Sequence, residues 1–462
     1  MGDTVAEASP QTLPAIQNPN GPGGSHQVVL ASGSPRSRSR YGFMTSLFGT
    51  VSAVALGLWL VWPYGSPFER SISPLDYQGR TERLLSTTPL IDGHNDLPYL
   101  LRLELKNKIY DEVKFTFRES LAGHTDLQRM KKGKVGGQFW SVFVECPDIV
   151  QLDDPNHAVR DTFEQIDVAK RIISRYDELH YCETSSCVPA AFRAGKVPSM
   201  LGAEGLHQAG SSIALIRQLF DAGVRYITVT HNCNNAFATA ASTVTETGRD
   251  GGLSDFGAAA VVEMNRLGMM IDLSHTSHKS MRQVMDITRS PVIFSHTACY
   301  ALSATYRNAP DDVIARLKTN GGVLMVFFVG RFLNAKNPDA ADIETAVDHI
   351  MHVVAVAGWD HVGIGADFDG TIDLANGISS VADYPKVIEA VMRRGATDEQ
   401  VRKLVGENIL RAWRQNEVNA KRFSKELPVE DVWEGRRWTR WDNGLPIMIP
   451  GNPDRIAGKN HP

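Results

Sequence analysis

Histidines and carboxylates recur directly after short apolar runs along this 462-residue chain. They are His94, Asp96, Glu204, His231, His275, His296, Asp367 and Asp369. Imidazole nitrogens and carboxylate oxygens, without thiolates, are donors that zinc and similar first-row metals accept. A single one of these residues beside a strand would more often be structural. Their recurrence predicts a metal-dependent site, provided that the fold brings them together.

Eight apolar runs alternate with helix-like segments and would position these side chains. The runs span 89–91, 138–144, 199–202, 226–229, 269–273, 291–294, 322–328 and 361–365. Helical periodicity over 211–222 and 256–267, and a capping box from Thr397 to Gln400, indicate helices outside the strands. This alternation is typical of parallel βα units, and eight strands are what a (β/α)8 barrel requires. The sequence therefore predicts an α/β fold with a TIM-like barrel over residues 74–425.

The ionisable residues fall at the ends of the predicted strands. Six of the eight runs end in such a side chain, and only the second and seventh do not. In (β/α)8 barrels the functional groups lie at the C-terminal ends of the strands. We therefore expect one cluster of these side chains at the mouth of the barrel.

Two pairs in this set could each chelate one metal ion. His94 and Asp96 stand two residues apart on an extended segment, so their side chains point to the same side, although alone they could equally stabilise a turn. His275 and His296 close consecutive strands and could bind a second ion. Glu204 lies on the third strand, and its two oxygens could bridge both ions. Two such ions would polarise a carbonyl group and generate a hydroxide nucleophile from a shared water.

The remaining residues suit acid–base chemistry. His231 and Asp367 could transfer a proton or stabilise an oxyanion, because both need only to reach the substrate. Asp369 is second to Asp367 and could be structural. The sequence thus divides the set into metal ligands and groups that act on the substrate.

Composition limits the class of protein. With 42% hydrophobic residues, 22% charged residues and a formal net charge of −4, the chain is neither wholly disordered nor collagen-like. The near-neutral charge gives no support for nucleic-acid binding. Length alone would allow about three domains or one barrel with tails. The positions of the apolar runs favour the barrel.

The N-terminal part predicts a membrane anchor. Residues 1–40 are rich in Pro, Gly and Ser and predict a disordered cytosolic tail. Residues 41–64 hold an uncharged apolar run of about the 20 residues that cross a bilayer. The basic residues that precede this run are Arg36, Arg38 and Arg40. The positive-inside rule then places the catalytic part on the lumenal or extracellular side of a single-pass signal-anchor, with a cleaved signal peptide and a core helix as alternatives.

Seven sequence strings around these residues resemble one family. They are IDGHNDLP (91–98), GGQFWSVF (136–143), GAEGLH (202–207), TVTHNCN (228–234), IDLSHTS (271–277), VIFSHT (292–297) and GADFDG (365–370). In this order they resemble the membrane (renal-type) dipeptidases, zinc metallopeptidases with an amidohydrolase-like barrel. The resemblance spans about residues 74–413. It implies a hydrolase that cleaves the peptide bond of dipeptides.

The resemblance also implies a ligand set. Two zinc ions per chain are expected, one bound by His94 and Asp96 and the other by His275 and His296. Glu204 is expected to bridge the two ions, with a shared hydroxide as the nucleophile. Members of the family are often dimers, so a homodimer is compatible with the resemblance.

Three further residues receive roles from the resemblance. His231 is expected to stabilise the tetrahedral oxyanion, and Asp367 to handle the proton that moves to the leaving amine. Arg307 is expected to hold the C-terminal carboxylate of the dipeptide. From the residues alone, the guanidinium of Arg307 could serve as a fork for a carboxylate. Without the resemblance, a surface arginine would be the favoured interpretation.

The five cysteines form one expected pair, one possible pair and one single residue. Cys146 and Cys233 match positions that are disulfide-bonded in the family, which would agree with an oxidising compartment. Cys182 and Cys187 could pair locally or stay as thiols. Cys299 is expected to be an unpaired core residue.

The chain departs from the family pattern in two respects. Residues 235–239 differ from the family pattern beside the substrate pocket, which bears on side-chain preference. The chain carries no C-terminal lipid-anchor signal, and residues 65–73 and 426–462 are predicted to be a linker and a tail that packs on the barrel.

Two alternative functions stay open. One is another amidohydrolase-type reaction on the same metals, which is weaker because those relatives usually have a carboxylated lysine. The other is a catalytically silent scaffold.

Overall fold

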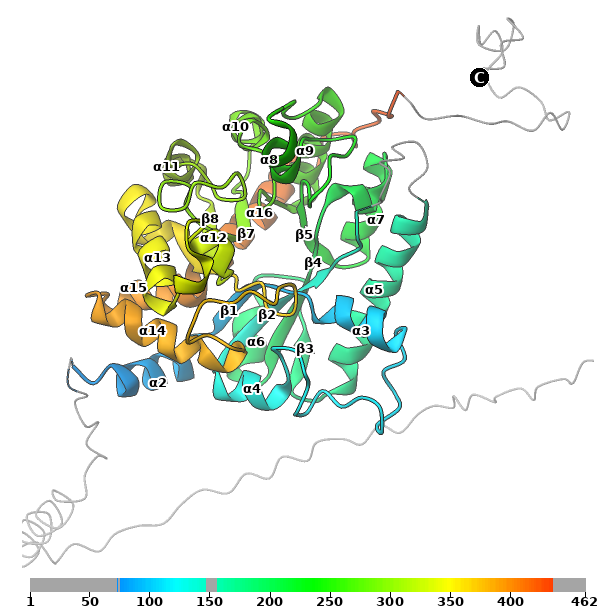
Figure 1. Ribbon diagram of the computed structural model, residues 1–462. Coiled ribbons are helices and arrows are strands. Elements are labelled where there is room, and N and C mark those ends of the chain that lie inside the picture. The colour runs from blue at the N-terminus through cyan, green and yellow to red at the C-terminus, as the bar shows by residue number, and fades with distance from the viewer. Residues whose placement is uncertain (1–72, 74, 147–155, 435–462) are drawn as a thin grey trace, which may run out of the picture. The chain divides into compact units, whose positions relative to one another are not determined.

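Eight parallel strands close into a barrel in the computed structural model of the protein (Figure 1). The structure describes residues 73, 75–146 and 156–434. The barrel strands are β1 (Leu90–Asn95), β2 (Val135–Val142), β4 (Val197–Ala203), β5 (Val224–Thr228), β6 (Met270–Asp272), β7 (Ile293–Thr297), β8 (Val323–Val326) and β9 (Val362–Ile364). Strands pair in the order β2, β1, β9, β8, β7, β6, β5, β4, and pairing of β2 with β4 closes the ring. Each of the eight predicted runs overlaps one of these strands, which confirms the TIM-like barrel.

The sequence does not predict one strand, β3 (Leu179–Tyr181). This strand pairs with the first half of β4, where Leu179 lies opposite Val197, and it stands outside the closed ring. Its three residues include the exposed His180, so the segment has no apolar run that would indicate a strand.

Helices surround the barrel (Figure 1). They are α2 (Tyr77–Thr87), α3 (Leu97–Leu105), α4 (Leu127–Lys132), α5 (Asn156–Arg175), α6 (Cys187–Arg193), α7 (Ile213–Asp221), α8 (Ala241–Thr247), α9 (Asp255–Leu267), α10 (His278–Ile287), α11 (Asp311–Asn320), α12 (Gly330–Leu333), α13 (Ile343–Ala357), α14 (Tyr384–Arg393), α15 (Asp398–Arg402) and α16 (Asn408–Phe423). The predicted helices over 211–222 and 256–267 correspond to α7 and α9. Thr397 and Gln400 form the predicted capping box at the start of α15.

The inside of the barrel is filled in layers. One buried cluster contains Phe139, Met200, Tyr226, Met270, Ile293 and Met325. The residue that follows each of them belongs to the larger cluster. Because side chains alternate along a strand, these six side chains fill the barrel and the residues that follow them lie between the strands and the helices. Thr228, Asp272 and Ser295 stand two residues after members of the first cluster, so they also face inward, one layer nearer to the C-terminal ends of the strands.

The predicted tail (1–40) and membrane span (41–64) lie outside the described residues, as does nearly all of the predicted linker. Within the part of the chain that the structure describes, no helix is both long enough and apolar enough to cross a membrane. The anchor therefore stays a prediction from the sequence.

The predicted C-terminal tail is described as far as residue 434. The backbone N–H of Val429 donates a hydrogen bond to Glu263 of α9 at 3.1 Å. The ring of Trp433 packs at 5.8 Å from that of Phe256, also on α9. This part of the tail thus lies against an outer helix of the barrel.

Candidate metal centre

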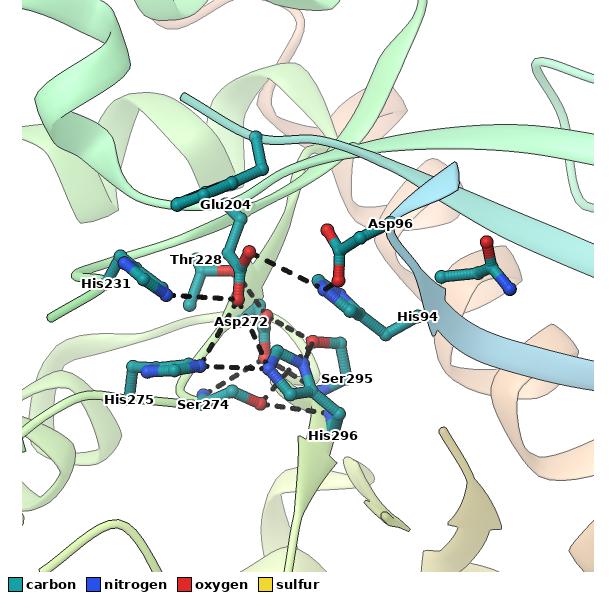
Figure 2. A network of polar contacts seen from close by, with 12 residues as sticks. His94, Asp96, Glu204, Thr228, His231, Asp272, Ser274, His275, Ser295 and His296 are labelled. Carbon is teal, nitrogen blue, oxygen red and sulfur yellow. Dashed lines mark hydrogen bonds and ion pairs between the residues drawn. The ribbon is translucent and has the colours of Figure 1, made fainter. Parts of the chain in front are cut away.

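The predicted metal ligands meet around the carboxylate of Glu204, which directly follows β4 (Figure 2). Oε1 of Glu204 lies 3.2 Å from Nε2 of His275 and 3.2 Å from Nε2 of His296, and Oε2 lies 3.6 Å from Nε2 of His94. All four side chains are buried. One carboxylate therefore stands between imidazoles that come from β1, β7 and the end of β6.

Two sets of three donors share Glu204. His94 and Asp96 complete one set, and His275 and His296 complete the other. Within each set the donor atoms lie within 4.8 Å of one another, and Nε2 of His94 is 3.2 Å from Oδ2 of Asp96. This is the arrangement expected of two adjacent cation sites with one bridging carboxylate.

Several donor atoms of these sets have no ordinary hydrogen-bond partner. Among the described residues, Nε2 of His94 and Oδ1 of Asp96 are buried without one. Nε2 of His275 lies only 3.0 Å from Nε2 of His296. Buried polar atoms are nearly always paired, and buried lone pairs that converge are costly without a cation. The donor set therefore fits bound metal ions, and its nitrogen and oxygen atoms fit zinc.

Each of these three imidazoles is held through its other ring nitrogen. Nδ1 of His94 lies 3.0 Å from the hydroxyl of Tyr226. Nδ1 of His275 lies 2.9 Å from Oδ1 of Asn232, and Nδ1 of His296 lies 2.8 Å from Oγ of Ser295. Partners of this kind fix the orientation of a metal-binding ring. All three rings therefore direct Nε2 toward Glu204.

His231 lies at the edge of the cluster and is held less firmly. Its Nε2 is 3.9 Å from Oε1 of Glu204, and its Nδ1 is 3.9 Å from Sγ of Cys146. Burial lowers the pKa of His231 well below its usual value. A neutral imidazole in this place can donate its one N–H to a substrate oxygen.

Asp367 approaches the cluster from the loop after β9. Its carboxylate lies within 4.8 Å of ring nitrogens of His94 and His296. Burial raises the pKa of Asp367 to about 7. The φ angles of Asp367 (67°) and His275 (60°) lie in the left-handed region. This conformation is strained for residues other than glycine, and such strain is typical of functional sites. Asp367 is thus held where a carboxyl group can exchange a proton near neutral pH.

Arg307 is buried beside the same histidines. Its Nη2 donates to the backbone oxygen of His296 at 2.9 Å, and its Nη1 donates to Oγ1 of Thr297 at 2.7 Å. Among the described residues its Nε has no partner. Burial lowers the pKa of Arg307 to about 10, so the guanidinium stays charged at neutral pH. A buried cation with a free donor fits an anionic ligand group.

Asp369, the second choice among the carboxylates, takes part in a contact between loops. Its carboxylate accepts a hydrogen bond from the backbone N–H of His124, and its own N–H donates to Nδ1 of His124 at 2.9 Å. Asp369 therefore connects the loop before α4 to the loop after β9.

The family model described as membrane dipeptidase (peptidase family M19) matches residues 78–426. The chain belongs to the membrane dipeptidase family. The resemblance expected from the seven strings is thereby confirmed.

Similar proteins agree with this family. An uncharacterized dipeptidase of Schizosaccharomyces pombe is 47% identical over 369 residues, which are 78% of this chain and 88% of the relative. The dipeptidase verJ of Clonostachys rogersoniana is 40% identical over 371 residues, 78% of this chain and 94% of the relative. A solved metallopeptidase of Rhodobacter sphaeroides, liganded with a phosphinate mimic of the dipeptide L-Ala-D-Ala, is 25% identical with a TM-score of 0.63, covering 71% of this chain and 99% of that one. The predicted enzyme class, a metallo-dipeptidase, is confirmed.

The disulfide expected for this dipeptidase from the family resemblance is present. Cys146 and Cys233 are bonded and join the loops after β2 and β5. A second disulfide links Cys182 to Cys187 between β3 and α6, which decides between the two alternatives for this pair. Cys299 is buried and forms no disulfide.

Sequence reasoning missed two buried carboxylates that lie beside the predicted ligands of this dipeptidase. Asp92 lies two residues before His94 and accepts a hydrogen bond from its backbone N–H at 3.2 Å. Asp272 lies three residues before His275 and accepts from the N–H of Ser274 at 3.1 Å. In both strands an Ile-Asp pair precedes a ligand histidine. That repeated pair was the signal that could have indicated them.

Proposed function

We propose that this dipeptidase hydrolyses dipeptides with two zinc ions, which the two donor sets that share Glu204 would hold. The observation that carries the proposal is the pair of donor sets that share this one buried carboxylate. His94 and Asp96 would hold one ion, and His275 and His296 the other. When bound, the ions supply Lewis acidity toward the scissile carbonyl and toward the attacking water.

In this proposal Arg307 orients the substrate. A dipeptide carries its C-terminal carboxylate at a fixed distance from its only peptide bond. Binding of that carboxylate by a buried guanidinium therefore sets the position of the bond over the cluster. The Rhodobacter sphaeroides relative, which takes a mimic of a dipeptide, supports a substrate of this size.

His231 and Asp367 act on the reacting atoms. The water oxygen bonds to the carbonyl carbon, the C–N bond breaks, and two amino acids leave. His231 donates a hydrogen bond to the oxygen that becomes negative in the tetrahedral intermediate. Asp367 accepts the proton of the attacking water and gives it to the leaving amine. The position of Asp367 supports both transfers, because its carboxylate lies within 4.8 Å of ring nitrogens of His94 and His296 and so reaches the cluster.

We also propose that residues 41–64 anchor the enzyme with a single span. The support is the uncharged apolar run and the three arginines before it, which favour a cytosolic N-terminus. The two disulfides are typical of a catalytic part that lies outside the cytosol.

Activity and metal content test the catalytic proposal. Full-length protein in detergent should release both amino acids from simple dipeptides such as L-Ala-L-Ala and L-Ala-D-Ala. It should lose this activity in a chelator and regain it with zinc. Metal analysis should find two zinc ions per chain. A zinc-loaded protein that cleaves nothing in a broad dipeptide panel would contradict the substrate, and a single zinc ion in a fully active protein would contradict the two-ion centre.

A further inference from the structure

Asp272 forms the centre of a polar layer inside the barrel, next to the metal ligands (Figure 2). Its Oδ2 accepts hydrogen bonds from Oγ1 of Thr228 and Oγ of Ser295, both at 2.6 Å. Its Oδ1 accepts from the backbone N–H groups of Ser274 at 3.1 Å and Ser295 at 2.8 Å. Asp272 is fully buried. All four of these contacts are hydrogen bonds that the carboxylate accepts.

Ser295 connects this carboxylate to a metal ligand. Its Oγ lies 2.8 Å from Nδ1 of His296. A serine hydroxyl has one proton, and Ser295 donates that proton to Oδ2 of Asp272. Oγ of Ser295 must then accept a hydrogen bond from Nδ1–H of His296. The lone pair of the ring is left on Nε2, which lies 3.2 Å from Glu204.

We propose that Asp272, acting through Ser295, is a positioning residue that selects the metal-binding tautomer of His296. The proposal rests on the proposed function, because it concerns the ion assigned to His275 and His296. Asp272 also holds the N–H of Ser274, the residue before His275 with its left-handed backbone. One carboxylate thus contacts the residue that precedes each of the two histidines assigned to this ion.

The other ion does not depend on this network. Nδ1 of His94 lies 3.0 Å from the hydroxyl of Tyr226, and that hydroxyl donates its single proton to the backbone oxygen of Gly93 at 3.0 Å. Because this hydroxyl has no second proton, it accepts a hydrogen bond from Nδ1–H of His94, and the lone pair of the ring is left on Nε2. Asp272 takes no part in these contacts. Loss of the Asp272 network should therefore weaken one ion of the two.

Thr228 offers a matched control for Ser295. Both hydroxyls donate to the same oxygen of Asp272 at the same distance, and both residues are fully buried. Of these two hydroxyls, Ser295 alone contacts His296. Thr228→Val removes one support of the carboxylate and keeps the connection, whereas Ser295→Ala removes the connection. A role in packing alone would make the two variants behave alike.

Asp272→Asn has a more specific consequence. The two backbone N–H groups at Oδ1 require the amide oxygen there, so the amide nitrogen replaces Oδ2. The amide then donates to Oγ of Ser295, whose proton turns toward Nδ1 of His296. This imposes the tautomer with a proton on Nε2, which has no lone pair for a metal.

Zinc retention measures these differences. The zinc-loaded full-length protein and its variants are titrated with a competing chelator, and the zinc per chain is counted. We expect Ser295→Ala and Asp272→Asn to release one ion at about 10- to 100-fold lower chelator concentration and to keep the other. Thr228→Val should follow the wild type. Asp126→Asn, which removes a buried carboxylate that caps α4, should follow it as well.

The outcomes are distinguishable. Equal zinc retention by Ser295→Ala and Thr228→Val would overturn the proposal, and so would loss of both ions to the same extent from Ser295→Ala and Asp272→Asn. A wild-type chain that never retains two zinc ions would overturn the proposed function, and this assignment with it.

Discussion

Arg307 is a buried cation whose guanidinium already donates to His296 and Thr297 and still has a free Nε among the described residues. We predict that Arg307→Ala raises KM for dipeptides and lowers kcat/KM by about 10- to 100-fold, because a hydrogen bond to a charged group contributes about 1.5–3 kcal/mol. Steady-state kinetics with a dipeptide and with the matching dipeptide amide measure the effect. The amide lacks the carboxylate, so the variant should lose the preference between the two substrates.

The amide also separates substrate binding from damage to the site. If Arg307→Ala lowered kcat/KM equally for the dipeptide and its amide, the arginine would act only by supporting the end of β7. Arg316→Ala is the matched control, because that arginine pairs with Asp286 at 2.8 Å and makes none of the contacts of Arg307. It should keep the kinetics of the wild type.

The clustering of the predicted ligand residues could be foreseen because each follows an apolar run, and parallel strands in a barrel end at one mouth. The groups that orient the rings could not be predicted in the same way. Tyr226 stands inside a strand, where it resembles a core residue, and Asn232 stands in a loop, where it resembles a turn residue. Their roles come from contacts between strands that are far apart in the sequence, which no local pattern encodes.

At the scale of elements, the burial of a strand determines whether the sequence can predict it. The barrel strands are buried on both faces, so even β6, with three residues, lies in a run (269–273) that is apolar except for Asp272. β3 is as short, but it lies at the edge beside β4 and leaves His180 exposed. A strand without a buried face on each side has no such signal.

The two disulfides close loops of very different length, which leads to a prediction on stability. Cys146 and Cys233 are 87 residues apart in sequence, and Cys182 and Cys187 are 5 apart. Loop-closure entropy predicts a stabilisation of about 4–5 kcal/mol for the long loop and about 2 kcal/mol for the short one. Replacing the first pair by serines should therefore lower the free energy of unfolding about twice as much as replacing the second. Denaturant titration of both double variants measures this.

The same two double variants should differ in activity. Sγ of Cys146 lies 3.9 Å from Nδ1 of His231, so loss of the long-loop disulfide should displace this imidazole and lower kcat without loss of zinc. The other disulfide lies beside β3 and α6, outside the cluster, and its loss should leave kcat unchanged. If kcat stayed at the wild-type value in both variants at a temperature where they are folded, the disulfide beside His231 would support only the fold.

At the scale of the whole molecule, one barrel supplies all the residues of the site. Six strands contribute the predicted ligands and reacting groups at their C-terminal ends, above an apolar layer and the polar layer around Asp272. The family match covers this barrel and not the first 77 residues. The N-terminal part has its own pattern, which combines an apolar run over 41–64 with a basic segment before it.

This pattern predicts how the enzyme sits in a membrane. Because Arg36, Arg38 and Arg40 favour the cytosolic side, protease added to sealed vesicles with the cytosolic face outward should remove only about the first 40 residues. Immunoblotting should show an intact barrel until the vesicles are permeabilised. Replacing the three arginines by glutamine should increase the digested fraction, since the charge bias that sets orientation is lost. Digestion of the wild-type barrel in sealed vesicles would contradict the orientation, and release of the enzyme by an alkaline wash would contradict the span.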